Sequence, residues 1–153
     1  MSSPDPGKYR HERDTLFRAI AEQTTDFISL CDAQGVITYA SPAALTLFQC
    51  SPEEMRGRHF IEFLAEPSVP AALAAFCRGR DQGEPALNLE LSMKRKDGST
   101  FIGELNGSRL PAGGQQGALV IIRDITERKR VEQALRESED RYRQLIESAN
   151  DWV

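Results

Sequence analysis

The first part of the chain alternates short apolar runs with turn residues. Residues 10–23 place their apolar side chains on one helical face, which predicts a helix. The segments "DFISLCD" and "VITYA" are rich in β-forming residues, and the "DAQG" between them predicts a turn. Together, these two segments predict a β-hairpin.

Three helices are predicted after the hairpin. The segments "SPAALTLF" and "SPEEM" both begin with Ser-Pro, and Ser41 and Ser51 are expected to cap these helices. Glu54 would complete a capping box with Ser51. A third, longer helix is expected to begin at Pro70 and to end at Gly79.

The next stretch changes to a period of two, which is typical of strands. Asp97-Gly98 predicts a tight turn into the strand "TFIGELNGSRL", and the apolar run "ALVIIRDI" is expected in the centre of a sheet. The predicted order is two strands, three helices and three strands. The side chains that share one face of the first strand in this stretch are Leu87, Leu89, Leu91 and Met93.

A long helix is predicted from Thr126 to about Ser148. Its apolar residues follow alternating steps of four and three, the heptad pattern of coiled coils. At 1.5 Å per residue it would be about 35 Å long, too long to be buried against a domain of this size. It is therefore either a coiled coil between two copies or a solvated linker. The seam positions are Val131, Leu135, Ser138, Tyr142, Leu145, Ala149 and Trp152.

The last twelve residues repeat a pattern from the first predicted helix. Aligning Tyr142 with Phe17 matches "YRQLIESANDWV" to "FRAIAEQTTDFI" without a gap. A repeat of this kind indicates a tandem array of modules. The expected segments are a flexible lead at 1–10, one complete domain at 11–125, a coiled-coil helix at 126–141, and the start of a second, truncated copy at 142–153.

Composition narrows the class of protein. The net charge of the 153 residues is -4, and no apolar run is long enough to span a membrane, so we expect contact with neither nucleic acid nor a membrane. Three widely spaced cysteines favour a reducing compartment, here the cytoplasm, over a disulfide framework. We expect Cys31 and Cys77 in the core and Cys50 at the surface.

Four segments of the chain together resemble one known family. They are "DFISLCDAQGVITYASPAALTLF", "SPEEMRGRHFIEFL", "LELSMKRKDGSTF" and "VIIRDITERKRVEQAL". Over about residues 16–135 the chain resembles a PAS domain, the sensory module of bacterial signalling proteins such as sensor histidine kinases. The resemblance implies an α+β fold: a five-stranded antiparallel sheet with helices on one face, a cavity between them, and a long C-terminal signalling helix.

The resemblance also implies a function. Such a module binds a small ligand or senses through dimer geometry, and passes the signal through its C-terminal helix to an output domain outside this chain. The implied assembly is a homodimer formed through the N- and C-terminal helices. The alternative is a ligand-free PAS domain with a fully packed core, which serves only for dimerisation or as a spacer.

The ligand-binding residues implied are side chains that would face one another across the cavity. His59 would offer a hydrogen bond, although capping a helix explains this histidine as well. Gly103 and Gly107 remove side chains from a strand and could leave room for a ligand. A domain of this size also needs such apolar residues to fill its core, so both interpretations remain open. The candidates are Phe48, His59, Phe60, Phe76, Leu91, Leu105 and Val120.

The sequence leaves the cofactor unknown. Haem-binding members of the family use a histidine on the long helix, and residues 71–80 contain none. Flavin photosensors of the family use a cysteine in a Gly-Arg-Asn-Cys context, where this chain has His59 and Phe60 in "GRHF". No pair of cysteines or histidines has metal-ligand spacing, so no metal site is expected.

No catalytic residues are predicted, and the chain itself is not expected to be an enzyme. The segment "HERDT" from His11 resembles the phospho-accepting box of histidine kinases, but Leu16 stands in place of the proline of that box. A solvated histidine at the start of a helix is the simpler interpretation.

The predicted signal-transmission residues are Asp124 and Thr126, where the last strand becomes the long helix. An aspartate at such a junction can accept backbone or hydroxyl hydrogen bonds and fix the angle at which the helix leaves. Thr126 is expected to cap the helix. The resemblance implies that this junction carries the signal.

Overall fold

The computed structural model describes residues 6–110 and 117–151. Its elements follow the predicted order, with two short 3₁₀ helices added. They are α1 (Pro6–Gln23), β1 (Phe27–Cys31), β2 (Ile37–Ala40), α2 (Ala43–Phe48), α3 (Pro52–Met55), η1 (Phe60–Phe63), η2 (Glu66–Ser68), α4 (Val69–Gln82), β3 (Ala86–Lys94), β4 (Thr100–Arg109), β5 (Ala118–Asp124) and α5 (Thr126–Asn150).

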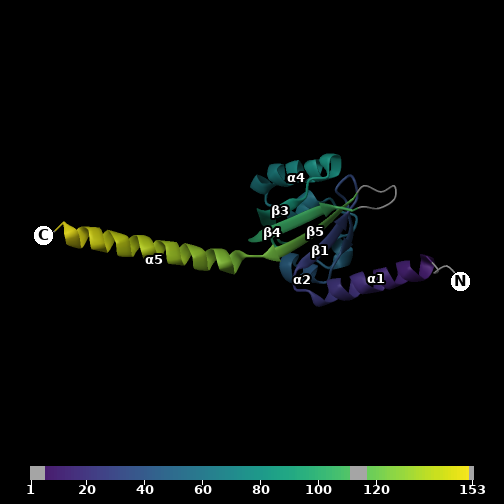
Figure 1. Ribbon diagram of the computed structural model, residues 1–153, viewed down its shortest axis with the longest axis horizontal. Coiled ribbons are helices and arrows are strands. Elements are labelled where there is room, and N and C mark those ends of the chain that lie inside the picture. Colours follow the sequence, from purple (N-terminus) through teal and green to yellow (C-terminus); the bar gives the residue numbers. More distant parts are fainter. Residues whose placement is uncertain (1–5, 111–116, 152–153) are drawn as a thin grey trace.

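The five strands form one sheet in the order β2-β1-β5-β4-β3, and every neighbouring pair is antiparallel. The apolar strand β5 lies in the centre, as predicted. Helices α2, α3 and α4 are packed around the sheet, and α5 runs out from it on the side away from the start of α1 (Figure 1). The predicted α+β architecture with a long C-terminal helix is therefore confirmed.

Turn residues fix both hairpins. Gly98 adopts a φ of +89°, and the Asp97 carboxylate accepts a hydrogen bond of 2.9 Å from the Ser99 amide. In the first hairpin Gly35 has a φ of +87°, and Asp32 accepts from the Gln34 amide at 2.9 Å. Glycine is favoured at both positions because a Cβ atom is strained at positive φ.

The predicted alternation along β3 is wrong at its first member. A bulge shifts the register between Ala86 and Leu89, and Asn88 within it adopts a φ of +51°. Leu87 consequently turns to solvent, with 70% of its surface exposed, whereas Leu91 and Met93 point into the core. One extra residue reverses the facing of every side chain before it.

Two predicted helix boundaries also change. Helix α4 runs through Gly79 and ends at Gln82, since the left-handed residue that stops it is Gly83 with a φ of +70°. Helix α1 begins at Pro6, ahead of the predicted start at residue 10. Of the lead expected at 1–10, residues 1–5 lie outside the described part of the chain.

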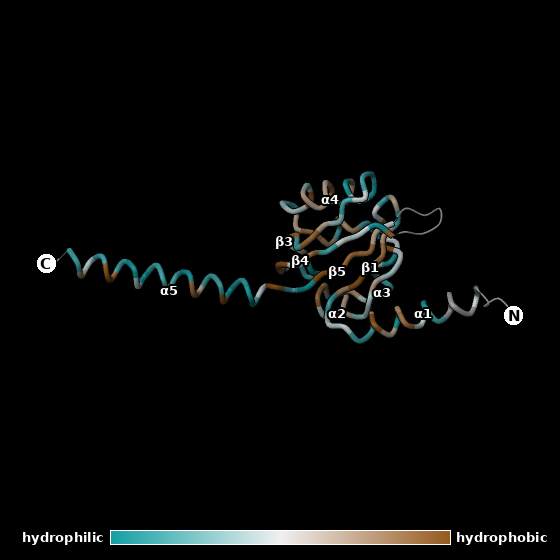
Figure 2. The backbone as a smooth tube through the Cα atoms, in the orientation of Figure 1, coloured by the Kyte–Doolittle hydropathy of each residue, from teal (hydrophilic) through white to brown (hydrophobic). Residues whose placement is uncertain are grey.

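The core is centred on Phe48, which is 1% exposed. Its ring centroid lies 5.0 Å from that of Phe27, 5.8 Å from Phe63 and 5.2 Å from Phe101, all in edge-to-face arrangements. Figure 2 shows the apolar residues of the strands gathered inside the domain. Cys50 is buried against the same core, contrary to the surface position expected for it.

Ser41 ties the start of α2 to the sheet instead of capping the helix. Its hydroxyl is fully buried and accepts a hydrogen bond of 2.9 Å from the Ile28 amide, while α2 has Pro42 at its cap position and no side-chain cap. Ser41→Ala should lower the free energy of unfolding by about 1–3 kcal/mol, because it leaves a buried amide without a partner.

Chemical denaturation of Ser41→Ala beside Ser108→Ala, an exposed serine on β4, tests this role. Ser108→Ala should change the stability by no more than about 0.5 kcal/mol. Equal stabilities for the two variants would show that the Ile28 amide does not depend on the hydroxyl.

Helix α5 leaves the domain after its first turn. Every residue from Arg130 to Asn150 is exposed, and the helix carries a row of apolar residues on an otherwise polar surface (Figure 2). Among them Val131, Leu135, Tyr142 and Leu145 are 60–68% exposed. Such a stripe on an isolated helix is a surface without a partner.

None of the helices in the described residues is both long and apolar enough to cross a membrane.

Candidate functional site

A cavity of about 100 Å³ lies between α4 and the sheet. The helix contributes Ala72, Ala75, Phe76, Gly79 and Arg80 to its wall. These positions repeat at i, i+3, i+4, i+7 and i+8 and so share one face of α4. Three of them are alanine or glycine, and their small size explains why this face leaves space in front of the sheet.

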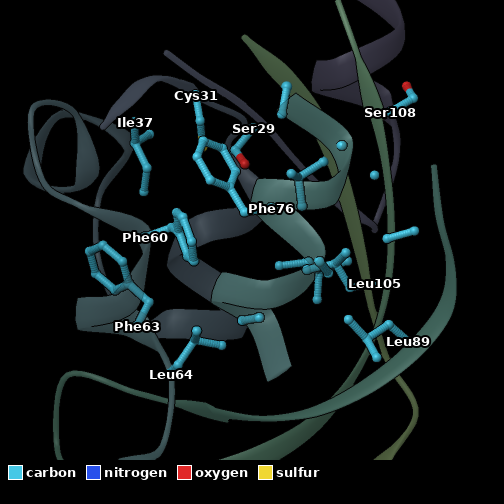
Figure 3. Close-up of a pocket in the computed structure, with 18 of the residues that line it drawn as sticks. Ser29, Cys31, Ile37, Phe60, Phe63, Leu64, Phe76, Leu89, Leu105 and Ser108 are labelled. Atoms are coloured by element: carbon cyan, nitrogen blue, oxygen red, sulfur yellow. The ribbon is translucent and has the colours of Figure 1, made fainter. Parts of the chain in front are cut away.

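The opposite wall is the inner face of the sheet. In Figure 3, Leu89 and Leu105 lie across the cavity from the rings of Phe60 and Phe63. The wall extends from the paired residues Phe27 and Ile122 to the paired residues Cys31 and Ala118. Four residues along a strand correspond to about 13 Å, so the cavity is elongated parallel to β1.

Five of the seven predicted ligand-binding residues line this cavity, and two do not. Leu91 is buried in the core without reaching the cavity wall. His59 lies outside the lining and caps η1. The candidates found in the cavity lining are Phe48, Phe60, Phe76, Leu105 and Val120.

His59 forms a complete capping box. Its Nδ1 accepts a hydrogen bond from the Ile61 amide at 3.2 Å, and its own amide donates to the Glu62 carboxylate at 3.2 Å. The ring packs on Phe60, with 4.7 Å between centroids, and its Nε2 would lie 2.6 Å from a Cβ atom at Gly35. This histidine therefore positions Phe60 in the cavity wall.

The two glycines of β4 play different parts. A Cβ atom at Gly103 would lie 2.9 Å from both Ile122 and Met93, so this glycine permits close packing and leaves no space. Gly107 lines the cavity, and a Cβ atom there would meet only ordinary contacts of 3.6 Å or more. Of the two glycines expected to leave room for a ligand, only Gly107 therefore leaves space at the cavity.

The interior of the cavity carries little polarity. Ser29 and Cys31 are the polar groups on β1, and burial, followed by the nearby Asp32 carboxylate, raises the pKa of the Cys31 thiol to about 11. The thiol consequently stays protonated at neutral pH and behaves as a small apolar group. No buried polar side-chain atom in the described residues lacks a hydrogen-bond partner.

Sequence reasoning missed the small residues of α4 and the residues at the open end of the cavity. The spacing of Ala72, Ala75 and Gly79 could have predicted that they share one helical face, because all three lie within a single predicted helix. Arg80 and Arg109 come from distant parts of the chain and carried no such signal. Only the pairing of the strands brings the end of β4 close to the end of α4.

The junction between β5 and α5 is held by the two predicted residues, in roles that differ from simple capping. The Asp124 carboxylate accepts a hydrogen bond of 2.9 Å from the Thr126 amide. The Thr126 hydroxyl accepts one of 3.0 Å from the Ile102 amide on β4, so it binds the helix start to the neighbouring strand. Ile125 between them is 2% exposed and donates to the Ile102 carbonyl.

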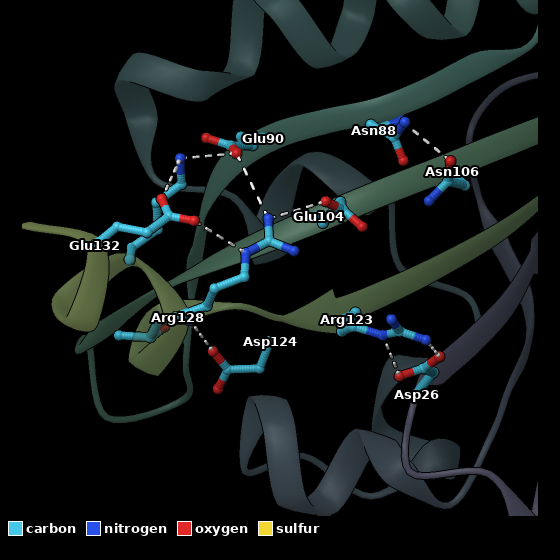
Figure 4. Close-up of polar contacts among 11 residues, drawn as sticks. Asp26, Asn88, Glu90, Glu104, Asn106, Arg123, Asp124, Arg128 and Glu132 are labelled. Atoms are coloured by element: carbon cyan, nitrogen blue, oxygen red, sulfur yellow. Dashed lines mark hydrogen bonds and ion pairs between the residues drawn. The ribbon is translucent and has the colours of Figure 1, made fainter.

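A charged cluster on the sheet holds the first turn of α5. Glu90 and Glu104 lie directly opposite each other on β3 and β4, an arrangement that is unfavourable for like charges. Arg128 lies between them, 3.2 Å from Glu104 and 3.9 Å from Glu90, and Lys129 lies 2.9 Å from Glu90 (Figure 4). The two cations of α5 thus offset a repulsion within the sheet.

No group of three or more potential metal ligands occurs within residues 6–110 and 117–151.

The chain is similar to sensor kinases. It is 28% identical over 128 residues to the sensor protein FixL of Bradyrhizobium diazoefficiens. This alignment covers 82% of this chain and 25% of FixL. It is also 28% identical over 126 residues to sporulation kinase A of Bacillus subtilis, covering 81% of this chain and 21% of that kinase. The chain thus spans about a quarter of the length of these curated relatives.

The fold is shared with solved PAS domains. A crystal structure of a PAS domain from Colwellia psychrerythraea superposes with a TM-score of 0.63 at 25% identity, covering 74% of this chain and 98% of that one. The PAS fold family itself matches residues 15–125, the part that holds the sheet, the cavity and the Asp124 junction. The chain therefore belongs to the PAS family and is a PAS sensory domain of the kind found in histidine-kinase signalling proteins.

Proposed function

We propose that this PAS domain binds a small apolar ligand between α4 and the sheet and passes the signal through α5 to an output domain. The observation that carries the proposal is the cavity of about 100 Å³, walled by apolar side chains and by the small residues of α4. A domain whose core served stability alone would fill such a space, because interiors are packed about as densely as organic crystals.

The connection to the output passes through the same sheet. Leu105, Val120 and Ile122 line the cavity from β4 and β5, and these two strands also hold the start of α5. A ligand that pushes on their inner face acts on the hydrogen bonds of the junction. The charged cluster around Arg128 then responds to the same displacement from the outer face.

The proposed assembly is a homodimer. The exposed stripe of α5 follows a heptad spacing, which suits a second copy of the same helix. Leu16 and Ile20 on α1 are 62% and 55% exposed, and they offer a second apolar surface on a different helix. We also propose that the domain works in the cytoplasm, in keeping with its unpaired cysteines.

The tandem arrangement is part of the proposal. Helix α5 continues without a break through Tyr142 to Asn150, as expected if its end doubles as the first helix of a following module. Trp152 and Val153, which complete the repeat, lie outside the described residues.

Ala75→Leu tests the cavity. Ala75 lines it, and leucine would occupy much of its space without disturbing the helical propensity of α4. The substitution should raise the free energy of unfolding by about 1 kcal/mol. It should also weaken binding of the uncharged probe 1-hexanol, followed by nuclear magnetic resonance titration, at least tenfold.

Ala74→Leu is the matched control, since Ala74 is exposed on the same helix and does not line the cavity. It should leave both stability and hexanol binding unchanged. A packed spacer domain predicts the reverse for Ala75→Leu: no hexanol binding to the wild type, and a loss of about 1–3 kcal/mol from overpacking. If ligand binding in the cavity is coupled to α5, hexanol should also shift the amide signals of Thr126 and Arg128.

A further inference from the structure

The open end of the cavity carries charge, in contrast to its interior. Arg80 near the end of α4, Glu84 in the loop after α4 and Arg109 at the end of β4 belong to its lining. This end corresponds to the Cys31–Ala118 side of the sheet, because Arg109 pairs with Ala118 and Ala118 with Cys31. A ligand that reaches this end meets charged side chains after about 13 Å of apolar wall.

Two of these three charges already have partners. The Arg80 guanidinium lies 2.9 Å from the Asp81 carboxylate and also donates a hydrogen bond to the Ala33 carbonyl. Glu84 lies 3.7 Å from Arg78, outside the cavity. Arg80 is further held 5.7 Å above the ring of Phe76, which itself lines the cavity. These contacts fix the charged groups around the opening.

Arg109 is different. It is exposed, and its side chain makes no hydrogen bond or ion pair with any other residue of the described chain. One of its guanidinium nitrogens would lie 3.8 Å from a Cβ atom at Gly83, which places it beside the last turn of α4. An arginine in this position presents a planar set of donors that matches a carboxylate in two parallel hydrogen bonds.

We propose that the ligand is a small monocarboxylic acid whose apolar body fills the cavity and whose carboxylate binds Arg109 at the opening. This inference rests on the proposed function of the cavity and adds the chemical class of its ligand. The charge has to lie at the opening, since burying a carboxylate among the apolar residues inside would carry a large desolvation penalty. Arg80 lies on the same rim, but its guanidinium is already paired with Asp81, which leaves Arg109 as the partner for the carboxylate.

The volume sets the size of the ligand body. A water needs about 10–15 Å³ by the same measure, so 100 Å³ corresponds to roughly seven to ten water-sized groups. Straight-chain acids of four to eight carbons, and benzoate, fall in this range. Dicarboxylic acids do not fit, because their second charge would be placed among the apolar residues at the far end of the cavity.

The test compares matched acids and alcohols. Straight-chain carboxylates of four to eight carbons and the alcohols of equal length are titrated into the whole chain by nuclear magnetic resonance or calorimetry. At the preferred length, the acid should bind at least tenfold more tightly than the alcohol. Arg109→Gln should abolish this preference and leave alcohol binding intact, whereas Arg56→Gln, on an exposed arginine outside the lining, should leave the preference unchanged.

The outcomes separate the two proposals. Equal binding of acid and alcohol to the wild type, or a preference that survives Arg109→Gln, overturns the carboxylate assignment while the cavity remains a ligand site. If no member of either series binds, both the carboxylate assignment and the proposed ligand site are wrong. An acid preference that weakens as salt is raised, only in proteins that retain Arg109, supports the assignment further.

Discussion

Phe48→Ala is expected to lower the free energy of unfolding by about 3–5 kcal/mol. The ring is almost fully buried and contacts three other phenylalanine rings, from β1, η1 and β4. Its removal opens a void between the sheet and the helices that small neighbours such as Ala44 cannot fill. Chemical denaturation followed by circular dichroism measures the loss directly.

Leu45→Ala serves as its control. Leu45 lies on the same helix α2, but 62% of its surface is exposed. Its replacement should change the stability by no more than about 0.5 kcal/mol. If the two variants lost the same stability, the ring cluster around Phe48 would not be the centre of the core.

Leu135→Glu is expected to dissociate the proposed dimer. Leu135 is 60% exposed on an isolated helix and is the second position of the heptad seam. Burial of one leucine contributes about 1.5–3 kcal/mol, so losing it from both chains should raise the dimer dissociation constant about 100-fold or more. Sedimentation velocity at several concentrations reports this constant.

Gln133→Glu supplies the matched control, because it adds the same charge on the side of α5 opposite the seam. It should leave the dimer largely intact. A wild-type chain that stays monomeric at high concentration would contradict the proposed coiled coil, and a dimer insensitive to Leu135→Glu would place the interface elsewhere, such as on α1.

The order of the elements could be predicted because local signals determine it. Asp97-Gly98 specifies a hairpin whatever packs around it, and the apolar run of β5 favours a central strand with a neighbour on each side. The Leu87 error has a non-local cause. The bulge before Leu89 is stabilised by the Asn106 side chain, which accepts a hydrogen bond from the Asn88 amide across eighteen residues of sequence.

The cavity could be predicted only in part, for a similar reason. Its aromatic residues were recognisable by type, and five of the seven candidates line it. His59 and Thr126 have polar side chains that could serve several partners, and the partner is chosen by the tertiary structure: the Ile61 amide for one, and the Ile102 amide for the other. Arg109 is an unremarkable surface residue until β4 is placed beside α4.

The way α5 is attached has a mechanical consequence. The helix is 25 residues long and contacts the domain only near its base, through the Thr126–Ile102 hydrogen bond and the ion pairs of Arg128 and Lys129 with the sheet. The rest of the helix follows any change in the direction of this base. At 1.5 Å per residue the helix is about 37 Å long, so a tilt of about 10° moves its tip by roughly 6 Å, slightly more than the rise of one helical turn. Geometry alone would amplify a sub-ångström rearrangement beneath the sheet into a movement of several ångströms at the tip of α5.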